Sequence, residues 1–190
     1  IGAGWKQEEW EAYGYDYPST RERLATLGEH LEIITRMLDA TTDERATYTG
    51  QRARVVGAVN QPKPLQYPRV PVMVGGNGPE VTWRLAARHA DEINLDGLDP
   101  AGVAEALPVI RERCEEIDRD PASLKVSVHT WYTEPGVSER GQARVDLFGA
   151  YRDLGLSRVQ SYVDGLADGT EALESFAEDL RAAGIALENR

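Results

Sequence analysis

The stretch from Val70 to Leu95 constrains the fold more than any other part of the chain. It opens with Val70-Pro-Val-Met-Val, a short apolar run typical of a strand buried on both faces. The run stops at a glycine-rich turn, after which Pro79 suits the first position of a helix. A second short strand ends at Leu95. The stretch therefore predicts one strand–helix–strand unit, the building block of a parallel sheet.

The turn itself reads Gly75-Gly76-Asn77-Gly78. Its three glycines free the backbone to adopt positive φ and to approach a ligand closely. Backbone N–H groups beside a helix N-terminus form a ready site for a phosphate. The same letters also suit an ordinary tight turn, because they lack the spacing of the dinucleotide fingerprint and the Lys-Ser/Thr of a P-loop. The turn by itself is therefore compatible with two interpretations, a phosphate-binding site and a purely structural turn.

Strand and helix alternate through the rest of the chain. Further strands are predicted at residues 124–132 and 157–163, and helices at residues 100–118, 138–154 and 170–183. Such alternation gives either a doubly wound sheet or a (β/α)₈ barrel. A barrel needs eight strands and typically about 250 residues. With 190 residues and four such strands, the chain is too short to close one.

The part before residue 70 is less regular. Residues 6–20 are expected to form a long aromatic loop of the kind that often covers a site. Ser19 or Thr20 can cap an amphipathic helix that follows, with Arg23 on its solvent side. A small hairpin is expected around Gly50, and a proline-rich connector leads to the central strand.

Alternation along the predicted strands brings polar side chains to one end of the sheet. Successive strand residues point to opposite faces, and sites of parallel barrels lie at the carboxyl ends of the strands. The inward set at these ends comprises Asn94, His129, Trp131 and Gln160. This polar ring predicts a site without reference to any other protein.

His129 is the one candidate catalytic side chain, and two interpretations of it stay open. It could donate a proton near neutral pH, or it could be a hydrogen-bonded histidine that lines the interior. His30 and His89 lie on predicted helices and are expected at the surface. No His, Cys or Asp residues have metal-ligand spacing, so no metal is predicted.

Bulk properties narrow the class of protein. The net charge of −11 argues against nucleic acid and anionic membranes as partners. No apolar run approaches the roughly 20 residues of a membrane span, and the single cysteine, Cys114, excludes an internal disulfide framework. These features lead us to expect a cytoplasmic protein whose partner is a small-molecule substrate.

The longer sequence around the glycine turn resembles that of a known protein family. It resembles the luciferase-like flavin and deazaflavin oxidoreductases, above all the branch that uses coenzyme F420. The matching residues read Val-Gly-Gly-Asn-Gly-Pro-x-Val-Thr-x-Arg-Leu-Ala-Ala-Arg-His-Ala-Asp-x-Ile-Asn-Leu. The order Gly-Ala-Gly-Trp, an acidic stretch, Tyr-Gly-x-x-x-Pro and Arg-x-x-x-Leu is similar to that family from residue 2 onward. The resemblance is strongest over residues 62–128 and weak after residue 133.

The resemblance implies a TIM-type (β/α)₈ barrel of which residues 1–190 are the C-terminal portion, about strands 5–8 with their helices. The N-terminal strands would be absent, and with them the family's usual proton-handling residues. We therefore expect this portion alone to be inactive. Its open edges are expected to pair with the missing N-terminal half or with a second copy in a homodimer.

The resemblance also implies hydride transfer with coenzyme F420 to or from a small organic substrate. Residues expected beside the cofactor are Gly75, Gly76, Asn77, Gly78, Asn94, Asp96, Ala3 and Gly4. One alternative is an FMN-dependent monooxygenase of the same fold. A second, from another class, is a half-barrel that binds a cofactor or a partner chain without catalysing a reaction.

Overall fold

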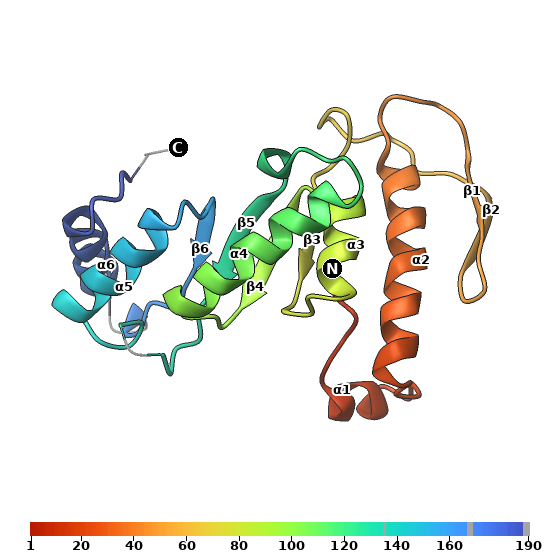
Figure 1. Ribbon diagram of the computed structural model, residues 1–190. Helices are drawn as coiled ribbons and strands as arrows, with labels where there is room; N and C mark the ends of the chain where they lie inside the picture. Colours follow the sequence, from red (N-terminus) through yellow and green to blue (C-terminus); the bar gives the residue numbers. More distant parts are fainter. Residues whose placement is uncertain (135, 167–168, 188–190) are drawn as a thin grey trace. The chain divides into compact units, whose positions relative to one another are not determined.

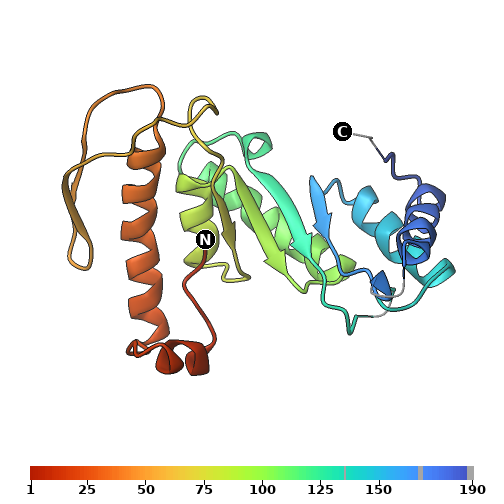
Figure 2. The same cartoon turned by 180° about the vertical axis from the view of Figure 1, so that it is seen from behind.

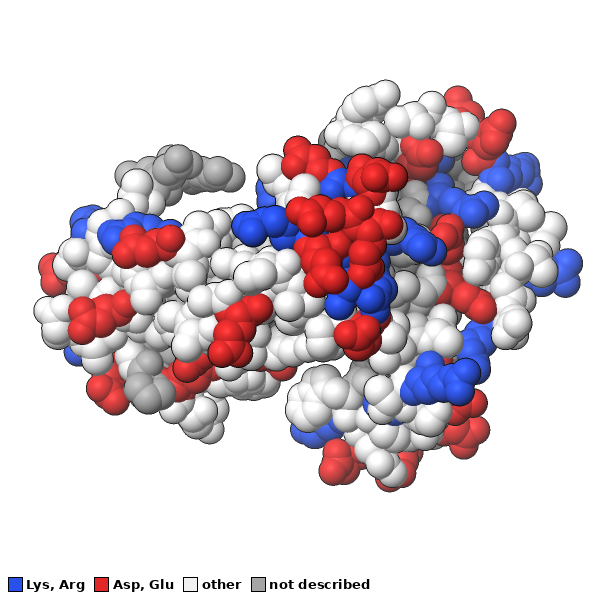
Figure 3. All heavy atoms as spheres, viewed as in Figure 1, with Lys and Arg blue, Asp and Glu red and all other residues white. Residues whose placement is uncertain are grey.

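The computed structural model describes residues 1–134, 136–166 and 169–187 (Figure 1). The chain divides into two compact units, Ile1–Glu92 and Ile93–Arg190. Among the described residues no helix is both long and apolar enough to cross a membrane. On the face drawn in Figure 3, Lys and Arg side chains lie interspersed with Asp and Glu.

The first unit combines three helices with three strands. They are α1 (Gln7–Ala12), α2 (Thr20–Leu38), β1 (Ala46–Thr49), β2 (Arg54–Ala58), β3 (Met73–Gly75) and α3 (Thr82–His89), and β4 (Glu92–Asp96) begins at the unit's last residue. The expectation of a plain loop over residues 6–20 was wrong, because α1 forms within it. The connector over residues 61–71 contains no helix or strand.

Helix α2 begins with the predicted cap. The Ser19 hydroxyl accepts from the Glu22 backbone N–H while the Glu22 carboxylate accepts from the Ser19 N–H, a capping box. Leu27 and Leu31 are buried on its inner side. A Cβ on Gly28 would lie 3.2 Å from Leu85, so the missing side chain lets α2 approach α3 closely.

Arg23 is not on the solvent side of α2, as the sequence had suggested, but buried. Its guanidinium lies 4.0 Å from the Tyr17 ring centroid. Its Nε donates to the Gly4 carbonyl at 3.2 Å, and a second nitrogen donates to Pro18. The planar, weakly hydrated guanidinium can be buried where acceptors and an aromatic face surround it. Arg23 thereby ties the chain's first turn to α2.

The predicted hairpin is confirmed. Strands β1 and β2 pair antiparallel, with Ala46 opposite Ala58 and Thr49 opposite Arg54. The Glu29 carboxylate of α2 accepts from three successive backbone N–H groups of the connecting turn, at 2.7–3.0 Å, in residues 51–53. These hydrogen bonds lower the pKa of Glu29 against the opposing effect of burial. One carboxylate therefore fastens the hairpin tip to the helix.

Strand β3 and helix α3 supply the apolar interior of the first unit, where Val74, Ala86 and Ala87 are buried. The Val72 carbonyl accepts from the backbone N–H groups of Asp91 and Glu92 at 2.8 and 3.3 Å. Arg69 holds the following turn by donating to the Asp91 carboxylate, at 3.1 Å through one nitrogen, and to the His89 carbonyl. Asp91 thus has a structural role.

His89 lies half-buried at the end of α3, which corrects the expectation that it is a surface residue. Its Nε2 is 3.8 Å from a Glu32 carboxylate oxygen. Burial lowers the pKa of His89 below the ordinary 6.5, and Glu32 only partly offsets this. Its position against α2 depends on helix packing rather than on the local sequence.

This lowered pKa predicts a loss of stability in acid. The folded state binds a proton on the His89 imidazole less readily than the unfolded state does. The stability that follows from neutral His89 is therefore fully present above the unfolded pKa, and it is lost as the pH falls through the folded pKa. We expect the free energy of unfolding to fall between about pH 7 and 5 by a smaller amount in His89→Gln than in the unmodified protein. Denaturant titrations at several pH values measure this, with the exposed His30→Gln as the control. Equal pH dependence in both proteins would contradict it.

Within its described residues, the second unit continues β4 and adds the following helices and strands. They are α4 (Pro100–Glu115), a short 3₁₀ helix (Pro121–Ser123), β5 (Lys125–His129), α5 (Gln142–Asp153), β6 (Arg158–Gln160) and α6 (Glu171–Ala182). The sequence predicted each of these elements except the 3₁₀ helix. It predicted β5 and β6 to be longer than they are in the structure. Figure 2 shows the strands from the opposite side.

The strands of the second unit are neighbours in the order β4, β5, β6. Ser127 pairs with Arg158 and His129 with Gln160, so β5 and β6 run parallel. Asn94 contacts Ser127, and Asp96 contacts His129 two residues further along both strands. Residue numbers therefore rise together along β4 and β5, which are parallel as predicted. The described strands do not form a closed barrel.

Candidate functional site

The glycine turn at the end of β3 is shaped by one tryptophan. The indole Nε1 of buried Trp83 donates to the Gly76 carbonyl, and its backbone N–H donates to the Gly78 carbonyl, both at 3.0 Å. In a planar trans peptide the N–H of the next residue points opposite to the carbonyl. The N–H of Asn77 therefore points away from Trp83.

Two of the glycines cannot be replaced without strain. Gly76 has φ +127°, a conformation that residues with a side chain rarely adopt. A Cβ on Gly78 would lie 2.8 Å from the Thr82 hydroxyl. A Cβ on Gly76 would lie 3.5 Å from the Thr82 methyl group, an ordinary contact, so the constraint at Gly76 is its backbone conformation alone.

Helix α3 begins at Thr82, three residues later than the predicted start at Pro79. The Gly78 carbonyl accepts from Trp83, five residues on, which is wider than an α-helical turn. Glu80 lies in this wide turn, where its carboxylate accepts from Arg84 at 2.7 Å. Arg84 is therefore engaged with Glu80.

The chain's first residues lie beside the turn. The Ile1 amino group donates to the Met73 carbonyl at 2.7 Å, and the Gly75 N–H donates to the Ile1 carbonyl at 3.1 Å. This is the pattern of a parallel pair in which Ile1 lies opposite Val74. Ala3 and Gly4 follow directly, and Gly4 has φ +76° with Trp10 packed where its Cβ would be. The structure therefore places the first residues of the chain, which include the predicted Ala3 and Gly4, beside the end of β3.

A buried polar layer crosses the strands of the second unit. The Asn94 side-chain amide donates to the Ser127 hydroxyl at 2.9 Å and to the Gln160 side-chain oxygen at 3.3 Å. Asn94 and Ser127 are buried. Buried polar groups persist where they satisfy one another. Asn94 and Gln160 are therefore together, as the strand alternation predicted, and Ser127 joins them.

A second layer lies two residues nearer the carboxyl ends and comprises Asp96, His129 and Tyr162. The Nδ1 atom of His129 is 3.4 Å from an Asp96 carboxylate oxygen. The His129 ring centroid is 5.7 Å from that of Tyr162. A carboxylate on one ring nitrogen fixes the orientation of an imidazole and directs its other nitrogen elsewhere.

Aromatic rings extend this layer toward solvent. Trp131 lies edge-on to His129 with centroids 5.0 Å apart, and Tyr132 lies 6.1 Å from Tyr162. A Cβ on Gly97 would lie 2.7 Å from the Trp131 ring, so the absence of a side chain there makes room for the indole. Trp131, which the sequence placed in the same ring as Asn94, lies beyond His129 rather than beside Asn94.

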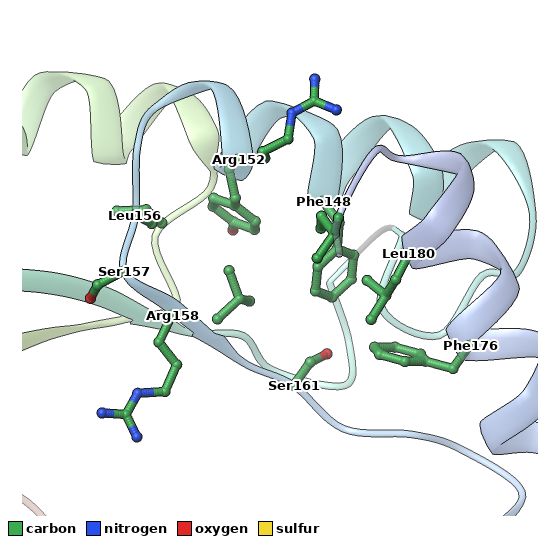
Figure 4. Close-up of a pocket in the computed structure, with 11 residues that line it drawn as sticks. Phe148, Arg152, Leu156, Ser157, Arg158, Ser161, Phe176 and Leu180 are labelled. Atoms are coloured by element: carbon green, nitrogen blue, oxygen red, sulfur yellow. The ribbon is translucent and has the colours of Figure 1, made fainter. Parts of the chain in front are cut away.

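A cavity of about 360 Å³ lies on the opposite face of β6, against α5 and α6. Its lining includes Val159, Ser161, Phe148 and Phe176 (Figure 4). Gln160 and Tyr162, which face the polar layers, do not line it. The cavity thus belongs to the space between sheet and helices and is not part of the polar layers.

Sequence reasoning missed Trp83 and the separation of the polar residues into two layers. A signal existed for the layers: Asn94, Ser127 and Gln160 are spaced by 33 residues, as are Asp96, His129 and Tyr162. No comparable signal marks the indole bonds of Trp83. Across the residues that the structure describes, no group of three His, Cys, Asp or Glu side chains could hold a metal ion.

Comparison with known proteins adds the family context. The model of the protein family described as luciferase-like monooxygenase matches residues 1–179. An uncharacterized protein of Mycobacterium tuberculosis is 35% identical over 91 residues, which are 48% of this chain and 30% of the relative. An F420-dependent glucose-6-phosphate dehydrogenase of Segniliparus rotundus is 29% identical over 126 residues, 65% of this chain and 36% of the relative. The chain thus spans about a third of these curated relatives.

Solved structures share the fold at low identity. An F420-dependent secondary alcohol dehydrogenase matches with a TM-score of 0.60 at 20% identity, over 94% of this chain and 59% of the other. The F420-dependent tetrahydromethanopterin reductase of Methanopyrus kandleri matches with a TM-score of 0.58 at 16% identity, over 98% and 57%. A long-chain alkane monooxygenase gives 0.54 at 14% identity, over 93% and 53%. At these identities the likeness concerns the α/β fold.

Proposed function

The chain belongs to the luciferase-like monooxygenase family, and from this premise we propose that it is part of an oxidoreductase that uses coenzyme F420 for hydride transfer to or from a small organic substrate. Residues 1–190 are the C-terminal portion of a single (β/α)₈ barrel domain in this proposal, with β3 to β6 as strands 5–8. The preference for F420 rests on the sequence similarity to an F420-dependent glucose-6-phosphate dehydrogenase.

The observation that carries the cofactor assignment is the geometry of the Gly76–Gly78 turn. Trp83 holds two of its carbonyls, and the N–H of Asn77 points the other way. Gly76 has no side chain where an anion would approach. The main chain here fits a phosphate of the cofactor, which would be held by backbone groups rather than by a basic side chain. Ala3 and Gly4, two and three residues after Ile1, would lie on the side of the cofactor ring.

The polar layers of the second unit take the remaining roles in the proposal. The bound cofactor would supply or accept the hydride. Asn94, which Ser127 and Gln160 hold in place, and Asp96 would be the cofactor-binding residues of this unit. His129 would hold the proton that accompanies the hydride, since Asp96 fixes its ring through Nδ1. Trp131 would exclude water from that side.

FMN remains the second candidate cofactor. Its single phosphate would suit the same turn, and the structures that share the fold include a long-chain alkane monooxygenase. Whether F420 or FMN binds depends on the rest of the cofactor, because the turn contacts only a phosphate in this proposal.

Fluorescence titration of the protein at full length tests the assignment. We expect saturable binding of F420, and affinity at least about tenfold lower for FMN and for the phosphate-free deazaflavin. The phosphate-free compound is the matched control, because it keeps the ring system and removes the group that the turn would hold. Tighter binding of FMN would transfer the proposal to the monooxygenase alternative. Binding of neither cofactor would favour a non-catalytic barrel.

A further inference from the structure

A second cavity lies on the surface of the first unit, apart from the glycine turn. It is about 360 Å³ and is lined by Glu9, Trp10, Tyr13 and Tyr15. All four residues come from α1 and the turn that follows it. Three aromatic rings and one carboxylate thus border a single hollow, and the proposed oxidoreductase function gives none of them a role.

The backbone holds these residues together. The N–H of Tyr13 donates to the Glu9 carbonyl at 3.1 Å, and the N–H of Tyr15 donates to the Trp10 carbonyl at 2.9 Å. Between them Gly14, at φ +79°, reverses the chain, as glycine commonly does after a helix. The two tyrosines are therefore returned to the same side of the helix end as Glu9 and Trp10.

Trp10 is the fixed wall of the cavity. Its ring packs against Gly4, where a Cβ would lie 2.8 Å from the indole. On another side it meets Tyr17 edge-on, with centroids 5.7 Å apart. Tyr13 and Tyr15 are exposed, at 80% and 67%. One packed indole and two accessible phenol rings therefore border the same hollow.

The charge at this place is negative. Residues 6–17 contain four carboxylates, those of Glu8, Glu9, Glu11 and Asp16, against one base, Lys6. Within the described part of the chain, no Lys, Arg or His side chain forms an ion pair with Glu9. The carboxylate that lines the cavity is thus available to an external cation.

We propose that this cavity binds a small organic cation of the trimethylammonium class. The faces of Trp and Tyr rings attract cations, and aromatic cages are the recurring solution for quaternary ammonium groups. Methyl groups bury favourably against the rings, whereas a primary ammonium needs three hydrogen-bond acceptors. An apolar cavity of about 150 Å³ already holds benzene, so this hollow admits the head group with a short substituent.

Calorimetric titration of the protein at full length with choline tests the proposal. Its neutral isostere, 3,3-dimethylbutan-1-ol, has the same shape without the charge. We expect saturable choline binding with millimolar affinity, and binding of the isostere at least about tenfold weaker. Equal binding of the two would mean an apolar groove and overturn the cation site. No saturable choline binding would overturn it outright.

Variants at exposed positions keep the test independent of folding. Tyr13→Leu retains apolar surface but removes a ring, and Glu9→Gln removes the charge. We expect each to weaken choline binding several-fold, while Tyr67→Leu, an equally exposed tyrosine outside the cavity, leaves it unchanged. Unchanged affinity in both cavity variants, or equal binding of ethylamine, would contradict the proposed recognition of a trimethylammonium group.

Discussion

Asp179→Ala is expected to destabilise the protein by about 3–5 kcal/mol, because it leaves a buried guanidinium without its counter-charge. The Arg144 side chain is only 3% exposed, and one of its nitrogens lies 3.1 Å from the Asp179 carboxylate. The same carboxylate oxygen accepts from the Gly141 N–H at 3.0 Å. Its removal therefore unpairs a charge and a backbone donor together.

The surroundings of Arg144 offer little to replace that carboxylate. A second guanidinium nitrogen donates to the Val137 carbonyl at 3.2 Å, and the group lies 4.8 Å from the Phe176 ring centroid. Its Nε has no hydrogen-bond partner among the described residues. The site already leaves one polar atom unsatisfied, so a further loss is costly.

Thermal and denaturant unfolding of the protein at full length measure this effect, with an expected fall in melting temperature of roughly 6–20 °C. Asp153→Ala is the matched control. Asp153 is 69% exposed on its side chain and lies 2.6 Å from Arg152, so its loss should cost less than about 1 kcal/mol. Equal effects of the two substitutions would show that Arg144 reaches solvent when Asp179 is gone.

The sequence predicted the elements that repeat a simple pattern. Apolar runs bounded by glycine or polar residues marked β3 and β5, and helical spacing of apolar residues marked α2 and α4. The two-residue period also put Asn94 and Gln160 on one face of the strands, which their hydrogen bond confirms. Local periodicity suffices in these cases because successive residues of a strand point to opposite faces, which the backbone geometry alone determines.

Features that depend on distant contacts escaped the same reasoning. Arg23 is buried because the Gly4 and Pro18 carbonyls and the Tyr17 ring surround it. His89 is half-buried because α3 packs beside α2. Neither partner set is adjacent in sequence, so a charged or titratable residue on a helix was assigned to the surface by default. For such residues, a plausible tertiary acceptor has to be sought before exposure is assumed.

At the glycine turn, some features were predicted from the sequence and others required the structure. Its strand and helix were recognised, but the helix begins late because Trp83 bonds back to Gly78. The sequence left a structural turn and a phosphate cradle open. The geometry adds the direction of the Asn77 N–H and the positive φ of Gly76. The choice between the two now depends on whether binding is lost when the turn alone is altered.

Gly76→Val is expected to weaken cofactor binding by about tenfold or more. A β-branched residue resists φ +127°, at a cost on the order of 1–3 kcal/mol, and its side chain occupies space that the proposal gives to the phosphate. Asn77→Ala should weaken binding only modestly, because the proposed contact comes from the backbone. Titration of the protein at full length with F420 measures both.

A control separates loss of the site from general strain. Gly155 also has positive φ, +74°, with open space around its Cβ position, and it lies in the second unit after α5. Gly155→Val should therefore lower stability without weakening F420 binding. If Gly76→Val binds F420 as well as the unmodified protein does, the turn is structural only, because neither the strain nor the added side chain affects the ligand. In that case the phosphate must be held by other groups of the barrel.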